Sequence, residues 1–141
     1  MNKILLAVTA IFFANTLSAA TFEVEMLNRL GKESMVYSQS VVNIQSGDTV
    51  KWLAKTKGHN VQFLSVPEGV GTFRSKLNVD TEYTFTVPGI YLYQCTPHKN
   101  MGMIAVVVVD GNKDNLNAIT SARVAGKSKQ RLAKIIETLS S

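Results

Sequence analysis

Short segments in which polar and apolar residues alternate run through most of this chain. In the segment TFEVEML, at residues 21–27, Phe22, Val24 and Met26 fall on one side, with glutamates between them. A period of two is that of a β-strand with one buried face. Comparable segments lie at residues 35–37, 40–44, 49–54, 60–64, 82–87, 90–95 and 104–109. Seven or eight short strands of this kind predict an all-β fold, a β-sandwich.

The spacing of apolar residues becomes helical after residue 111. A second helical stretch follows a break at Gly126, and Ser128 is the predicted N-cap of that second helix. We therefore expect two amphipathic helices between about residue 112 and the C-terminus, packed on the sandwich through their apolar faces. The spacing rests on Leu116, Ile119 and Arg123 in the first helix and on Leu132, Ile135, Ile136 and Leu139 in the second.

The first 20 residues have the three parts of a cleaved secretory signal peptide. Lys3 precedes the apolar run Ile4–Phe13, and the segment ends in Ser18, Ala19 and Ala20. A membrane anchor is the competing interpretation, but about 20 apolar residues are needed to span a bilayer and this run is shorter. The small residues favour cleavage after Ala20, and cleavage after Ala19 would leave a nearly identical product.

The remaining chain, residues 21–141, has the length of a single domain and contains no further stretch apolar enough to enter a membrane. We therefore expect a soluble, monomeric, periplasmic protein. Loss of Lys3 with the signal lowers the excess of basic over acidic side chains from five to four. These basic residues are scattered rather than gathered in a dense run, which favours acidic protein partners and argues against nucleic acid.

Candidate metal ligands occur in two loops between predicted strands. The only cysteine, Cys95, shares one loop with His98, Met101 and Met103, and His59, the second of two histidines, lies in another. Each of these residues has a structural alternative, as a small buried hydrophobe, a hydrogen-bonded histidine or a core methionine. Their joint occurrence at strand ends instead predicts one metal site, because loops at one end of a sandwich converge.

The ligand types narrow the choice of metal. One thiolate, two imidazoles and a weak thioether suit a blue-copper electron-transfer site. Zinc with one cysteine and two histidines would form an open, catalytic site that has no use for a thioether, iron–sulfur clusters need more cysteines, and calcium and magnesium prefer oxygen. A nucleophilic pair of Cys95 and His98 lacks an orienting carboxylate and leaves His59 unexplained. The sequence thus predicts one copper ion per chain and an electron carrier rather than an enzyme.

At these residues the sequence resembles the cupredoxins and, among them, the pseudoazurins. The matching stretches FEVEMLN, SGDTV, KGHNV and YQCTPHKNMGMIAVV extend over essentially the whole mature chain. The resemblance implies an eight-stranded Greek-key β-sandwich followed by two helices. Spacing alone leaves either Met101 or Met103 as the axial ligand. The resemblance of the MGM pattern implies Met103, so the implied ligand set is His59, Cys95, His98 and Met103.

Two residues beside the ligands are assigned supporting roles. The resemblance implies that the backbone of Asn60 donates a hydrogen bond to the sulfur of Cys95 and that its side chain ties the two loops together; the alternative is an ordinary turn asparagine. Pro97 has no backbone N–H, so one possible donor to the thiolate is absent and the reduction potential should rise. The alternative for Pro97 is that it only shapes the turn.

The residues around His98 predict a docking surface. We expect its ring edge to emerge through an apolar rim that includes Pro97 and Met101, which gives the electron a short way out. A ring of positive charge is expected around this rim, since the resemblance places basic residues where pseudoazurins carry docking lysines, although Gln94 stands where many have a further lysine. The predicted ring consists of Arg29, Lys57, Lys76 and Lys99.

The resemblance also implies redox partners. The chain would receive an electron from a cytochrome c or the cytochrome bc1 complex and donate it to a periplasmic reductase such as copper nitrite reductase. The alternative function is periplasmic copper storage or delivery, which would require accessible and exchangeable ligands.

Overall fold

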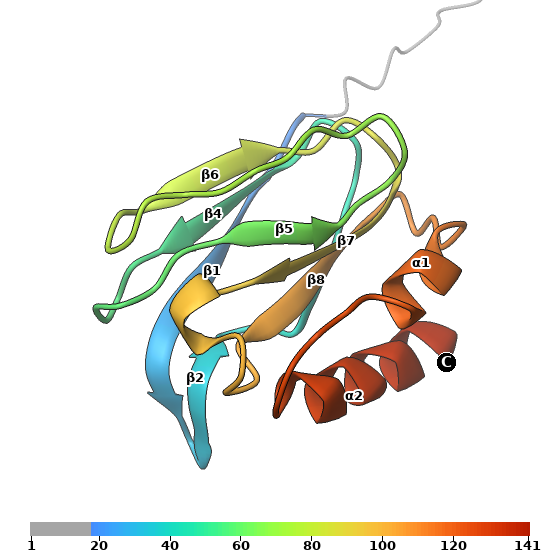
Figure 1. The fold of residues 1–141 in the computed structure, drawn as a ribbon. Coiled ribbons are helices and arrows are strands. Elements are labelled where there is room, and N and C mark those ends of the chain that lie inside the picture. The colour runs from blue at the N-terminus through green and yellow to red at the C-terminus, as the bar shows by residue number, and fades with distance from the viewer. Residues whose placement is uncertain (1–17) are drawn as a thin grey trace, which may run out of the picture.

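The computed structural model describes residues 18–141, so nearly all of the predicted signal peptide lies outside the described residues. Eight strands and two C-terminal helices make up this part of the chain (Figure 1). None of its helices is long and apolar enough to cross a membrane. The strands are β1 (Thr21–Leu30), β2 (Glu33–Tyr37), β3 (Val41–Ile44), β4 (Thr49–Leu53), β5 (Gln62–Ser65), β6 (Thr81–Thr84), β7 (Gly89–Gln94) and β8 (Ile104–Val109).

The strands form two four-stranded sheets, in the orders β2-β1-β4-β6 and β3-β8-β7-β5. Both sheets are mixed. β1 runs parallel to β4, with Thr21 opposite Thr49, and β3 runs parallel to β8, with Val41 opposite Val106, whereas the other neighbours are antiparallel. The predicted eight-stranded sandwich is confirmed, and every predicted strand segment overlaps one observed strand.

The main core lies between the two sheets and follows the alternation seen in the sequence. Val24 and Met26 of β1 are fully buried there, while Glu23 between the inward-facing positions is exposed. Trp52 and Tyr93 pack edge to face with ring centroids 5.3 Å apart, a favourable aromatic geometry. This packed interior fixes the strand ends that carry the ligand loops.

A second core covers the outer face of the β3-β8-β7-β5 sheet. β8 has the sequence IAVVVV and is buried at every position, because one face meets the sandwich interior and the other meets the helices. The helices are α1 (Leu116–Thr120) and α2 (Ser128–Ser140), and α2 contributes Leu132, Ile135 and Leu139 to this core. The predicted packing of the helices on the sandwich is therefore confirmed.

Two details of the helical prediction are wrong. α1 ends at Thr120, so Arg123 lies beyond it and is exposed. Ser128 is the first residue of α2 rather than its N-cap, a position taken by Lys127. The Ser128 side chain is fully buried, and its hydroxyl donates a 2.5 Å hydrogen bond to the carbonyl oxygen of Lys99 instead of capping the helix.

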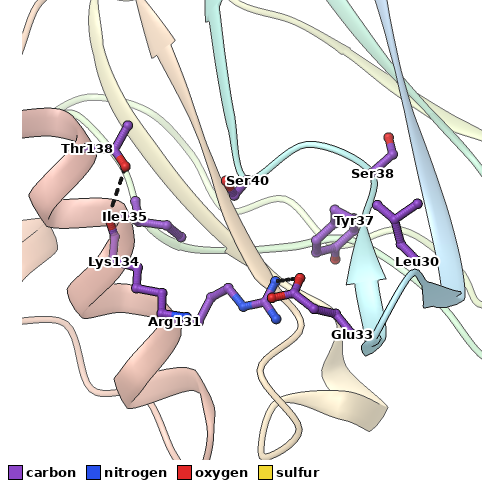
Figure 2. A pocket seen from close by; sticks show the side chains of 9 residues that line it. All are labelled: Leu30, Glu33, Tyr37, Ser38, Ser40, Arg131, Lys134, Ile135 and Thr138. Carbon is purple, nitrogen blue, oxygen red and sulfur yellow. Dashed lines mark hydrogen bonds and ion pairs between the residues drawn. The ribbon is translucent and has the colours of Figure 1, made fainter.

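A small polar cavity of 190 Å³ lies between α2 and β2 (Figure 2). Arg131 reaches across it from α2 to form a 3.1 Å ion pair with Glu33. The Glu33 side chain is 53% exposed, so this pair contributes at most about 1 kcal/mol to stability. The pair nevertheless links α2 to the sheet that does not contain β8.

Candidate metal centre

The sequence-predicted ligands gather at one end of the sandwich. Cys95 follows β7, His98 ends the short 3-10 helix η1 (Thr96–His98), Met103 precedes β8, and His59 lies in the loop between β4 and β5. The ligand atoms of His59, Cys95 and His98 all lie within 4.8 Å of one another. The structure thus brings together two loops that are separated by more than one strand in sequence.

The distances within this group centre on the cysteine sulfur. The Sγ atom of Cys95 lies 3.4 Å from Nδ1 of His98 and 3.7 Å from Nδ1 of His59. Met103 is fully buried in the same core cluster as Cys95, and its carbonyl oxygen accepts a 3.0 Å hydrogen bond from the Cys95 backbone N–H. Both imidazoles therefore present the same nitrogen to the thiol, with a thioether side chain in the same buried cluster.

Asn28 and Thr56 orient the ring of His59. Its Nε2 atom lies 2.8 Å from Oδ1 of Asn28 and 3.1 Å from Oγ1 of Thr56. Because an amide oxygen only accepts hydrogen bonds, the proton resides on Nε2 and the lone pair of Nδ1 faces Cys95. A second hydrogen bond of this kind is what fixes the orientation of histidine ligands in metal sites.

Sequence reasoning missed both of these residues. Asn28 belongs to β1 and Thr56 to the loop after β4, and the backbone N–H of Asn28 donates a 2.8 Å hydrogen bond to Thr56 Oγ1. The parallel pairing of β1 with β4 places them beside His59. The only sequence signal was a pair of polar residues at the ends of these two strands.

Burial sets the protonation states at this site. It lowers the pKa of His98, and burial together with the nearby His98 lowers the pKa of His59. Burial also raises the pKa of the Cys95 thiol, and hydrogen bonds from the backbones of Asn60 and His98 lower that pKa to a smaller extent. Both imidazoles are thus available as neutral ligands, and a bound cation would favour the thiolate that burial alone disfavours.

This donor set fits copper. Two neutral imidazole nitrogens converge on one thiol, a methionine is buried beside it, and the metal-binding group found in the described residues includes no carboxylate. Soft sulfur ligands with imidazole select copper over the hard cations that require oxygen. The residues would therefore hold one copper ion.

Asn60 connects the two ligand loops. Its Oδ1 atom accepts hydrogen bonds from the backbone N–H and the hydroxyl of Thr96, at 2.8 and 3.0 Å. Its side-chain amide donates to the carbonyl of Ser75 at 3.3 Å, and its own carbonyl accepts a 2.7 Å bond from the hydroxyl of Tyr37. Asn60 is 1% exposed, so these bonds are shielded from water.

The residues expected around the His98 edge lie at the surface. His98 is partly exposed, Pro97 is exposed in η1, and Met101 is 43% exposed. The basic residues of the predicted ring are exposed as well, on segments that contact the site. Those residues are Arg29, Lys57, Lys76 and Lys99. Lys99 follows His98 directly, and the segment that carries Lys76 contacts the site through the backbone N–H of Asn78, which donates to the His59 carbonyl.

Comparisons with known proteins agree with this site. Residues 24–110 match the family described as copper binding proteins, plastocyanin/azurin family. A pseudoazurin from Paracoccus pantotrophus is 39% identical over 116 residues, which cover 81% of this chain and 80% of the relative. A plastocyanin from a Synechococcus strain is 34% identical, covering 71% of this chain and 81% of the relative.

A solved structure gives the same result. The crystal structure of native pseudoazurin from Hyphomicrobium denitrificans is 30% identical in sequence and superposes with a TM-score of 0.79, covering 84% of this chain and 97% of that chain. The sequence match, the shared fold and the thiol, imidazole and thioether ligands point to the same relatives. The chain belongs to the plastocyanin/azurin family of copper-binding proteins, the blue-copper electron carriers, and within that family to the pseudoazurins.

Proposed function

We propose that this chain is an exported, periplasmic carrier of single electrons that holds one copper ion through His59, Cys95, His98 and Met103. The observation that carries the proposal is the convergence of two imidazole Nδ1 atoms on one buried thiol. Copper, when bound, supplies a single-electron couple between its cuprous and cupric states. The predicted signal peptide, residues 1–20, supports export, and cleavage would leave residues 21–141 as the mature domain.

The chain's own residues keep the ligands in place and exclude water. His59, Cys95 and Met103 have no exposed surface. Asn28 fixes one imidazole ring, and Asn60 holds the two ligand loops together. A site held in this way changes little when its charge changes, which is what a carrier of single electrons requires.

His98 is the proposed exit for the electron. It is the only one of the four proposed ligands with exposed surface in the described structure, and it lies beside Pro97 and Met101. A partner that packs against this rim would come within one imidazole ring of the copper. The absence of an N–H at Pro97 keeps the number of donors to the Cys95 sulfur small, which favours a high reduction potential.

The proposed partners are proteins with acidic docking surfaces. We propose a cytochrome c or the cytochrome bc1 complex as donor and copper nitrite reductase, or another periplasmic reductase, as acceptor. The basic excess of the sequence and the exposure of Arg29, Lys57, Lys76 and Lys99 support this choice. Opposite charges on two partners raise the rate of encounter, by tenfold to a thousandfold at low salt.

The docking proposal predicts a salt-dependent reaction. The rate constant for oxidation of the reduced protein by copper nitrite reductase should fall as ionic strength rises, because salt screens the attraction. Lys57→Ala combined with Lys76→Ala should slow the reaction about tenfold at low salt. Lys51→Ala combined with Arg123→Ala removes the same charge from two residues outside the predicted ring, so it is the matched control and should leave the rate unchanged. Stopped-flow measurement of the rate constant decides, and a flat salt dependence would contradict docking through this ring.

Copper storage or delivery is the competing function. Voltammetry and copper removal by a chelator together distinguish a carrier from a store. A carrier gives a reversible one-electron wave and keeps its copper through repeated cycles. A store would lose copper rapidly to a chelator, which the complete burial of three proposed ligands opposes.

The choice of Met103 over Met101 predicts a difference between two variants. Met103→Leu should raise the midpoint potential, because loss of a donor weakens binding of the cupric ion more than that of the cuprous ion. A tenfold change in relative affinity corresponds to about 59 mV. Met101→Leu changes an exposed side chain and should leave the midpoint in place. Voltammetry of both proteins tests the assignment, which fails if Met101→Leu produces the larger shift.

A further inference from the structure

The outer part of the ligand loop, residues 99–102, contacts the segment that leads into α2. The Ser128 hydroxyl donates to the carbonyl oxygen of Lys99 at 2.5 Å, and the backbone N–H of Lys127 donates to the carbonyl oxygen of Asn100 at 2.9 Å. Figure 1 shows the N-terminal end of α2 beside this loop. Ser128 is fully buried, so its hydrogen bond does not exchange with water.

The inner part of the loop is closed by its own backbone. His98 N–H donates to the carbonyl of Cys95 at 3.1 Å, Met101 N–H to the carbonyl of His98 at 2.9 Å, and Cys95 N–H to the carbonyl of Met103 at 3.0 Å. These bonds use the carbonyl oxygens of the three loop ligands. Lys99 and Asn100 lie between the ligands His98 and Met103 in sequence. Their carbonyl oxygens accept hydrogen bonds from the 126–128 segment.

Gly126 allows the two backbones to pass in contact. Its φ is +54°, and a Cβ atom built on it would overlap the carbonyl oxygen of Asn100 and lie 3.1 Å from that residue's C and Cα atoms. Any other residue at this position would therefore have to push residue 100 outward. The close approach shows that the position of the loop depends on the position of this segment.

We infer that residues 126–128 are a positioning element of the metal centre, although none of them is a ligand. α2 is anchored by Leu132, Ile135 and Leu139 to the sheet that contains β7 and β8, the two strands that bracket the loop. The N–H groups at a helix N-terminus also carry partial positive charge, which suits the loop carbonyls. The segment thereby fixes residues 99 and 100 and, through them, the spacing of His98 and Met103.

This inference rests on the proposed ligand set, but the packing it describes can be measured without copper. Ser128→Ala in the purified exported protein should speed amide hydrogen exchange at Met101 and Lys127 about tenfold in the metal-free state, because a buried hydrogen bond is lost. In the copper-loaded state it should shift the midpoint potential and speed copper loss to a chelator about tenfold. Ser140→Ala is the matched control, since it removes a hydroxyl bonded only within α2, to the carbonyl of Ile136, and should change none of these.

A second pair of variants separates contact from backbone strain. Gly126 and Gly111 have nearly equal positive φ values, +54° and +61°, but nothing lies within 4 Å of a Cβ atom at Gly111. Gly126→Ala should reproduce and exceed the effects of Ser128→Ala on exchange and midpoint, whereas Gly111→Ala should leave both unchanged. Should Gly126→Ala fail to fold, the serine pair decides.

Two results would overturn the positioning role. One is unchanged exchange at Met101 and Lys127 in Ser128→Ala. The other is faster exchange with no change in midpoint or copper loss, which would reduce the contact to local packing. An unmodified protein without a copper chromophore would instead refute the proposed function, and the metal-free exchange would still decide whether residues 126–128 hold the loop.

Discussion

Replacement of Cys95 by alanine is expected to abolish the intense visible absorption of the copper-loaded protein. That absorption arises from charge transfer between thiolate sulfur and copper, and Cys95 supplies the only thiol in the chain. The affinity for copper should fall by more than about a hundredfold, since the loss of an outer partner of a ligand alone costs tenfold to a hundredfold. Titration with copper, followed by visible spectroscopy, measures both effects.

The metal-free Cys95→Ala protein is the necessary control for folding. The side chain is small and fully buried, so its truncation should lower the free energy of unfolding by only about 1 kcal/mol and leave the circular dichroism spectrum unchanged. A folded variant that keeps the visible band would refute Cys95 as a ligand. An unmodified protein that stays colourless with copper and binds zinc tightly would refute the copper site itself.

Replacement of Asn60 by alanine is expected to destabilise the metal-free protein by about 4–6 kcal/mol. The variant loses three side-chain hydrogen bonds, two to Thr96 and one to Ser75, and leaves the backbone N–H of Thr96 without its partner. Each net hydrogen bond contributes about 1 kcal/mol, and an unsatisfied buried donor costs a further 1–3 kcal/mol. Denaturant unfolding of the metal-free protein gives the change directly.

Thr96→Val is the matched control for this prediction. It removes the hydroxyl that bonds to Asn60 but keeps the backbone N–H bond, so it should cost only about 1 kcal/mol. If the two variants are equally mild, Asn60 does not hold the loops together. Because the bond from Asn60 to the sulfur comes from the backbone, Asn60→Ala should retain a visible copper band, at reduced copper affinity.

The sequence supported the sandwich because the alternation of β1 is a direct consequence of one buried face. The unbroken apolar sequence of β8 departs from that alternation, because the structure covers this strand on both faces. The sequence also indicated Cys95, His59 and His98 as one group, because a lone thiol and only two histidines in strand-end loops leave few other arrangements. The two residues that hold His59, Asn28 and Thr56, could not be found in this way.

Those two residues depend on strand register. Asn28 meets His59 only because β1 runs parallel to β4, and no local pattern encodes that pairing. Ser128 is a case in which a local sequence pattern was present but predicted the wrong role. Its residue type and position match an N-cap, but tertiary packing brings the Lys99 carbonyl to its hydroxyl and the helix begins one residue earlier. A serine at this position is typical of a helix N-terminus, but the partner of its hydroxyl is determined by a contact with a distant part of the chain.

The parallel pairings of β1 with β4 and of β3 with β8 also bear on how this protein acquires its structure. Val41 pairs with Val106, so the second sheet is complete only when two distant parts of the domain have come together. Chains dominated by such distant pairings fold slowly, in milliseconds to seconds. The thiol of Cys95 lies between β7 and β8 and is fully buried in the folded domain, so it is shielded from oxidants only once the chain has folded. The speed of folding therefore determines how long this cysteine is exposed to oxidants.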